Sequence, residues 1–261
     1  FSLQEFIMVI SIALSKYLVK KFKTNNYGEV VIIGYNGGNS VEVQFINTGY
    51  ETTTTIMQIE KGTVKDKTVP SIYGVGVVGN ELVIDNLGNL PKEYKLWQDM
   101  LRRCYNSKFV QKNPTYKDCH VSENFKYYPY FKEWCNQQIG FGNEDWQLDK
   151  DILVKGNKLY SEDTCCFVPR EVNYLLVNRR LHRGEYPVGV SYDKQRDKFV
   201  AGHSVNGVRK GLGRYDTIEE AFRVYKLAKE SHIKQIAEAW KSSLDNRVYN
   251  ALINYNVDMY D

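Results

Sequence analysis

Three short β-like runs followed by one long amphipathic stretch, all within residues 186–240, restrict the fold more than any other feature of this sequence. The runs span residues 188–192, 198–205 and 208–215. Asn206-Gly207 separates the last two runs, and Asn-Gly between strands is a strong hairpin signal because both residues tolerate the positive φ of a tight turn. The pattern predicts three antiparallel strands.

The amphipathic stretch predicts a long helix after Asp216-Thr217. Either of these residues can cap its N-terminus, and Glu219-Glu220 favour the positive end of the helix dipole. Its predicted apolar face comprises Ala221, Phe222, Tyr225, Ala228, Ile233 and Ile236. We therefore expect one sheet face to pack on this helix and the other face to stay free.

Positive charge is concentrated in the same region, although the whole chain has a formal net charge of only +4. Residues 170–241 contain 15 Lys and Arg against 9 Asp and Glu, a net of +6, and the rest of the chain has a net of −2. A polyanionic partner such as nucleic acid is expected for this region. A solvated helix face is the alternative that charge alone leaves open.

The free sheet face is the predicted contact surface for DNA. The major groove admits β-ribbons, Arg can address guanine edges there, and Lys can hold phosphates. The predicted DNA-binding residues are Tyr192, Lys194, Arg196, Lys198, Arg209, Lys210 and Arg214. His182 and His203 are expected either to contact phosphate or to be plain surface residues.

This segment resembles the APETALA-two/ethylene-response-factor DNA-binding domain. The resemblance is carried by Gly189-Val190, Lys198-Phe199-Val200-Ala201, Asn206-Gly207-Val208-Arg209-Lys210, Leu212-Gly213-Arg214-Tyr215-Asp216-Thr217, and Glu219-Glu220-Ala221 with Tyr225 and Ala228. In that family the sheet reads the major groove, so the resemblance implies duplex contacts by Arg196, Lys198, Arg209 and Arg214. Phe199 departs from the family, which often has Trp there.

Two carboxylates in the middle of the chain are the candidate catalytic groups. Residues 146–153 predict a short strand on which Asp149 and Asp151 point to one face and Lys150 to the other. Carboxylates on one face suit Mg²⁺, which binds one or two carboxylates together with phosphate oxygens.

The central segment also resembles one that is widespread in bacteriophage proteins of the homing-endonuclease-like HNH group, where it often accompanies an APETALA-type domain. The resemblance is carried by Trp97 to Tyr105, Pro114-Thr115-Tyr116, Phe131 with Trp134, Leu148 to Leu153, Gly156-Asn157-Lys158, Tyr160-Ser161, Cys165 to Pro169, and Asn173. It implies that Asp149 and Asn173 bind a divalent metal, expected to be Mg²⁺. The implied catalytic set is Asp149, Lys150, Asp151 and Asn173.

The sequence departs from the HNH pattern at the base. Lys150 stands where the family has His, and a Lys acts as a base only if burial lowers its pKa. A catalytically degenerate scaffold is therefore the alternative to an active nuclease.

The whole chain is expected to be an α+β multidomain protein. Residues 1–22 predict a helix, 23–82 a small β-barrel-like module similar to Src-homology-three barrels, 83–182 the HNH-like (ββα-metal-like) domain, 183–241 the DNA-binding domain, and 242–261 a helical tail. Within the central domain, helices are predicted over 94–104 and 124–138, the second with a start or break at Pro129. Five Cys without a CxxC pair predict buried thiols and no disulfide-linked partner.

Together the two resemblances imply a phage-type, sequence-preferring duplex-DNA-binding protein that acts as a metal-dependent homing-type endonuclease. The alternatives are a non-cleaving DNA-binding regulator and a structural or partner-binding phage protein. No membrane partner is expected, because no stretch approaches the ~20 apolar residues of a membrane helix. The expected location is the cytoplasm of an infected bacterial host.

Overall fold

The computed structural model describes residues 20–81, 84, 87–176, 185–205 and 207–259. These residues form a mixed α+β fold, as the sequence predicts. The four-stranded and the three-stranded sheets are antiparallel. The described residues divide into two compact units. The first comprises residues up to 117 with 123–132, and the second comprises 118–122 with the residues from 133 onward.

The first unit begins with an open four-stranded sheet. Its strands, in the order β1-β2-β3-β4, are β1 (Lys21–Lys23), β2 (Glu29–Gly37), β3 (Ser40–Phe45) and β4 (Glu51–Thr55), followed by α2 (Ile56–Glu60). Within the described residues β1 and β4 do not pair, so the predicted barrel-like module is not a closed barrel. The predicted N-terminal helix of residues 1–22 is wrong at its end, where Lys21 and Phe22 pair with β2, and residues 1–19 lie outside the described part.

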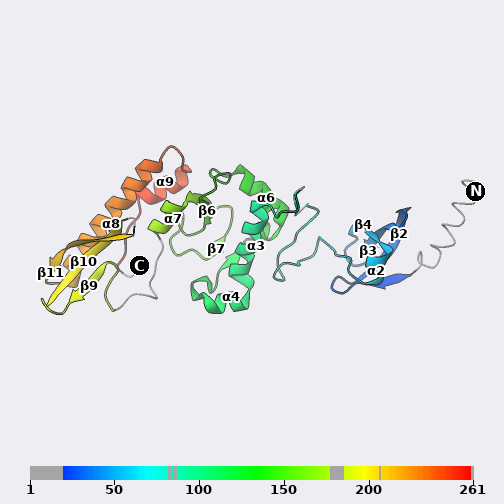
Figure 1. Ribbon diagram of the computed structural model, residues 1–261, viewed down its shortest axis with the longest axis horizontal. Helices are drawn as coiled ribbons and strands as arrows, with labels where there is room; N and C mark the ends of the chain where they lie inside the picture. Colours follow the sequence, from blue (N-terminus) through cyan, green and yellow to red (C-terminus); the bar gives the residue numbers. More distant parts are fainter. Residues whose placement is uncertain (1–19, 82–83, 85–86, 177–184, 206, 260–261) are drawn as a thin grey trace, which may run out of the picture. The chain divides into compact units, whose positions relative to one another are not determined.

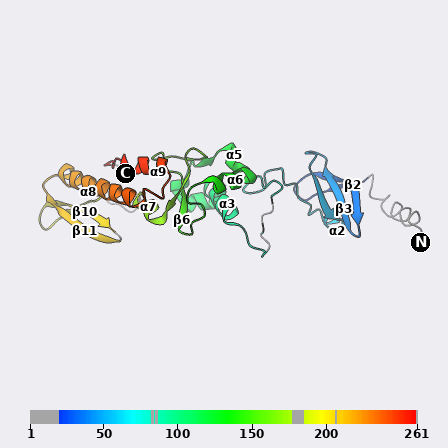
Figure 2. The ribbon, with the colours of Figure 1, turned by 90° about the horizontal axis from the view of Figure 1, so that it is seen from above.

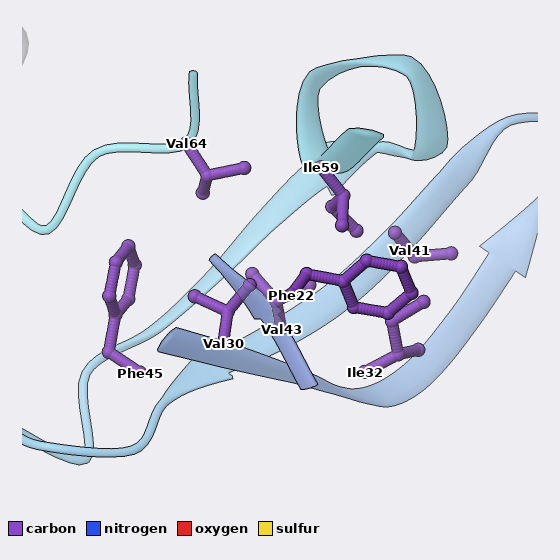
Figure 3. Close-up of a cluster of buried hydrophobic side chains, with 8 residues drawn as sticks. All are labelled: Phe22, Val30, Ile32, Val41, Val43, Phe45, Ile59 and Val64. Atoms are coloured by element: carbon purple, nitrogen blue, oxygen red, sulfur yellow. The ribbon is translucent and has the colours of Figure 1, made fainter. Parts of the chain in front are cut away.

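One face of this sheet carries its core. Alternate side chains of β2 and β3 point inward because successive residues of a strand face opposite sides. The buried residues are Phe22, Val30, Ile32, Val41, Val43, Phe45, Ile59 and Val64. Figure 3 shows these side chains converging from three strands, α2 and the loop after it.

The predicted central helices are confirmed. They are α3 (Lys92–Tyr105), α5 (Glu123–Lys126) and α6 (Tyr128–Gln137), with α4 (Ser107–Lys112) and the 3₁₀ turn η1 (Pro114–Tyr116) between α3 and α5. Pro129 is the second residue of α6, where its missing N–H leaves no helical hydrogen bond unmade. Trp97 is completely buried, and its indole N–H donates to the Phe125 carbonyl over 2.7 Å.

The second unit contains two small strand pairs. β5 (His120–Val121) runs parallel to β7 (Leu159–Tyr160), and β6 (Trp146–Asp149) runs antiparallel to β8 (Cys166–Pro169), which leads directly into α7 (Arg170–Leu175). The strand predicted over 146–153 therefore ends at Asp149.

Four of the five cysteines are buried, which agrees with the predicted buried thiols. Burial raises the pKa of the Cys165 thiol to about 12. Burial also raises the pKa values of Cys119 and Cys166. These thiols are therefore protonated core residues at neutral pH.

The C-terminal part of this unit is the predicted three-stranded antiparallel sheet with one long helix. The sheet has the order β11-β10-β9, with β9 (Val190–Asp193), β10 (Lys198–Val205) and β11 (Val208–Tyr215). α8 (Ile218–Trp240) packs along one face of it, and α9 (Asn246–Ile253) runs back beside α8 (Figures 1 and 2). Thr217 caps α8 in a capping box with Glu220, which confirms the predicted helix start.

Sheet and helix share one apolar core that residues beyond α9 complete. Ala201 of β10 meets Ala221, Phe222 and Tyr225 of α8, and Val257 from beyond α9 packs into the same cluster. Two hydrogen bonds hold the Val257 backbone in place. Its N–H donates to Glu230 over 2.9 Å, and its carbonyl accepts from Lys226 over 2.9 Å. The segment predicted as a tail is thus part of this module.

Candidate nucleic-acid interface

The strand register assigns the side chains of the C-terminal sheet to two faces. Ala201 lies opposite Gly213 and Val190 and is buried against α8, so this set marks the helix side. The alternate residues point the other way, because residues that face each other across antiparallel strands share a face. The surface opposite α8, called the open face below, carries Ser191, Asp193, Lys198, Val200, Ser204, Arg209 and Arg214.

Arg209 lies across the sheet rather than projecting from it. Its Nη2 donates to the Ser191 hydroxyl over 3.3 Å, which spans from β11 over β10 to β9. A Cβ atom on Gly202 of β10 would lie 2.8 Å from the Arg209 Nε atom. The absence of a side chain at Gly202 therefore makes room for this arginine.

Arg214 crosses the sheet in the same direction. Its Nε donates over 3.1 Å to the Oδ2 atom of Asp193, which also accepts from Arg196 Nη1 over 3.2 Å. The hydrogen bond from Arg214, together with that from Arg196, lowers the pKa of Asp193 below its usual value. Lys198 forms an ion pair with Asp216, which raises the Lys198 pKa. Cations thus outnumber carboxylates on and beside the open face.

Two predicted DNA-binding residues do not belong to the open face. Tyr192 lies opposite Phe199 on the helix side, with ring centroids 5.2 Å apart, and its hydroxyl donates to Asp197. Lys210 lies opposite His203, which is buried toward α8. The expectation that Tyr192 points outward with the arginines is therefore wrong, because neighbours in a strand point to opposite faces. Lys194 and Arg196 are exposed in the turn between β9 and β10.

A histidine pair that the sequence does not predict lies between the sheet and α8. His203 is only 7% exposed, and its Nε2 lies 3.0 Å from Nδ1 of His232. Both roles expected of His203, a phosphate contact or a surface position, are therefore wrong, and His182 lies outside the described residues. Burial, Lys229 and His232 lower the pKa of His203 to about 4, and burial and Lys229 also lower the pKa of His232. The spacing of Tyr225, Lys229 and His232 along one helical face is the signal that could have indicated the pair.

This pair predicts acid sensitivity of the C-terminal module. Because the folded-state pKa of His203 lies below the unfolded value of about 6.5, the stabilisation is complete above pH 6.5 and is lost as pH falls toward 4. The His203→Phe variant should lose about 2 kcal/mol less unfolding free energy than the wild type between pH 7 and 4.5. Urea unfolding at both pH values measures this difference. Identical losses in the two proteins would contradict the prediction.

The carboxylate of Asp149, at the end of β6, is engaged in hydrogen bonds with the backbone. Asp149 uses Oδ1 to accept the backbone N–H groups of Asp151 and Ile152, over 2.7 and 2.8 Å, and so closes a turn. Burial raises the pKa of Asp149 despite these hydrogen bonds. Asp151 lies in that turn, beyond the end of β6, so the prediction that both carboxylates share one strand face is wrong.

Lys150 is buried and holds the following loop. Its Nζ pairs with Asp151 over 2.6 Å and donates to the Asn157 carbonyl over 2.6 Å. Asn157 in turn donates to the Lys150 and Leu159 carbonyls, over 2.8 and 2.6 Å. Lys150 is thus engaged as a hydrogen-bond donor that holds this loop together.

The two predicted metal ligands each make hydrogen bonds to other groups of the protein. Asn173 donates its amide to Gln147 over 2.6 Å. Asp149 has one oxygen committed to the turn, and the buried ammonium of Lys150 follows it directly. Among the described residues, no group of three or more His, Cys, Asp or Glu side chains is arranged to hold a metal ion. Binding of Mg²⁺ by Asp149 and Asn173 stays a prediction.

Comparisons with protein-family models, curated proteins and solved structures found no match to this chain. Within the part of the chain that the structure describes, no helix is both long and apolar enough to cross a membrane.

Proposed function

We propose that this protein binds duplex DNA by placing the open face of the C-terminal sheet in the major groove. The observation that carries the proposal is the pair of arginines, Arg209 and Arg214, laid side by side on a sheet face opposite its supporting helix. Arg is the residue best suited to guanine edges, and the nearby Arg196 and Lys198 suit phosphates. The same proposal includes a bacteriophage origin, which the two resemblances in the sequence imply.

Duplex binding should depend steeply on salt. If three cations such as Lys194, Arg196 and Lys198 contact phosphates, affinity should fall roughly 40-fold between 50 and 200 mM salt. Fluorescence anisotropy with a pool of random-sequence duplexes measures this slope. The absence of binding at 50 mM salt would reject the proposal and leave the structural or partner-binding alternative.

Of the two DNA-binding alternatives, the non-cleaving regulator is better supported. Asp149 and Lys150 are each committed to holding a turn and a loop. The endonuclease alternative is supported by the arrangement of β6 and β8 as an antiparallel pair followed by α7, which resembles the ββα arrangement expected for the HNH group.

We expect no nicking of supercoiled plasmid in Mg²⁺ or Mn²⁺ under conditions in which the protein binds the same DNA. Agarose electrophoresis after incubation measures this, with the Asp149→Ala variant as a matched control. If the wild type nicked the plasmid and Asp149→Ala bound without nicking, the regulator proposal would fail and the endonuclease would replace it.

A further inference from the structure

Both arginines of β11 are held by side chains of β9, although β10 lies between these strands. Arg209 reaches Ser191, and Arg214 reaches Asp193. Ser191 and Asp193 are two residues apart and point to the same face. These two hydrogen bonds, called braces below, therefore run in parallel across the sheet.

The residues of β10 beneath the arginines permit this crossing. Val200 lies between Ser191 and Arg214 in the register, and Gly202 lies under Arg209. Because neither residue carries a polar group that competes for the guanidinium, the arginines find their hydrogen-bond acceptors on β9.

The brace on Arg214 uses only its Nε atom and leaves the two terminal Nη groups able to contact a base. Asp193 accepts the Nε hydrogen of Arg214, so both terminal Nη groups remain available on a side chain that is 51% exposed. Arg196 occupies the same carboxylate oxygen from the turn, and the Gln195 backbone N–H donates to the other oxygen over 3.2 Å. The carboxylate is thus fixed on several sides.

A fixed guanidinium differs from a free one in what it selects. An unbraced Arg can reach a phosphate of any sequence, whereas two parallel N–H groups held at a fixed angle match the O6 and N7 acceptors of guanine. Fixing the side chain before binding also reduces the entropy lost on association. The low pKa of Asp193 keeps its charge, and hence the brace, in place at neutral pH.

We infer that Asp193 is a positioning residue that presents the Nη edge of Arg214 to guanine, so that the protein selects duplexes with guanine in the contacted major groove. This inference rests on the proposed function.

The test compares guanine with 7-deazaguanine, which keeps base pairing and charge but lacks the N7 acceptor. A preferred duplex is first selected from the random pool with the full-length wild type, and is then synthesised in both forms. Anisotropy gives the affinity ratio for the wild type, Asp193→Ala and Asp193→Asn. Asp216→Ala is the matched control, because it removes one carboxylate beside the same face and leaves the Arg214 brace intact.

We expect the wild type to favour the guanine duplex by roughly tenfold or more. Asp193→Ala should reduce this ratio to below about threefold, Asp193→Asn should lie between because its amide oxygen can still accept from Arg214, and Asp216→Ala should keep the wild-type ratio.

Three outcomes would overturn the inference. If Asp193→Ala and Asp216→Ala raised the affinity for both duplexes alike and preserved the ratio, Asp193 would only repel phosphate. If Asp193→Ala melted at a lower temperature with an unchanged ratio, its role would be confined to the turn. Equal binding of both duplexes by the wild type would reject guanine reading while duplex binding stood, whereas no binding of either would reject the proposed function itself.

Discussion

Replacing Arg209 and Arg214 together by alanine is expected to weaken duplex binding by roughly 100- to 1000-fold. Each bidentate arginine–guanine contact contributes about 1–3 kcal/mol, and each tenfold in affinity corresponds to about 1.4 kcal/mol. Both side chains lie on the open face, and the core lies on the opposite side, between the sheet and α8. The variant should therefore fold like the wild type. Anisotropy at fixed salt measures the loss, and circular dichroism checks the fold.

The control for this experiment removes the same charge from other surfaces. Lys210 is adjacent to Arg209 but points to the helix side, and Lys234 is exposed on α8. The Lys210→Ala/Lys234→Ala variant should retain the affinity to within about fivefold, because only long-range attraction is lost. Equal weakening by the two double variants would show that net charge, and not the open face, binds the duplex.

Replacing Gly189 by alanine is expected to unfold the C-terminal module or to destabilise it by roughly 2–5 kcal/mol. Gly189 has φ +78°, and a Cβ atom there would lie 2.0 Å from a ring carbon of Tyr225. The left-handed conformation costs about 1–2 kcal/mol for alanine, and the overlap adds about 1–3 kcal/mol. Urea unfolding and hydrogen exchange of peptides from β10 and α8 measure the effect.

Two further variants separate these causes. A Cβ atom on Gly211 of β11 would enter open space, with nothing beyond its chain neighbours within 4 Å, so Gly211→Ala should change stability by less than about 1 kcal/mol. Gly189→Ala combined with Tyr225→Ala removes the overlap and leaves the backbone strain. A Gly189→Ala variant as stable as Gly211→Ala would contradict the packing seen around Tyr225.

The elements of the C-terminal module can be predicted closely because their signals are local. Turn residues, strand alternation and the Thr217 cap all lie within a few residues of the boundaries that they determine. The faces are harder to predict, because the register of β10 and β11 shifts between Ala201 and Gly202. Local sequence does not specify such a bulge, and without it Arg209 and Arg214, which are five residues apart, would point to opposite faces.

Non-local pairings account for what the sequence does not show. Whether a sheet closes depends on its first and last strands, and nothing local to β1 or β4 indicates that they stay apart. The contacts of Asp193 with Arg214 and of His203 with His232 join residues 21 and 29 positions apart. The sequence places Asp149 in a continuing strand because alternation cannot distinguish a strand from a turn that a side chain closes.

The position of Val257 in the core bears on how this module is made. Its side chain packs with Ala201 and Phe222, so the apolar cluster that supports the sheet remains incomplete until residue 257 has been synthesised. The strands and α8 precede Val257 in the chain and so emerge from the ribosome earlier. The sheet that carries the two arginines therefore gains its complete apolar support only after the ribosome has passed residue 257.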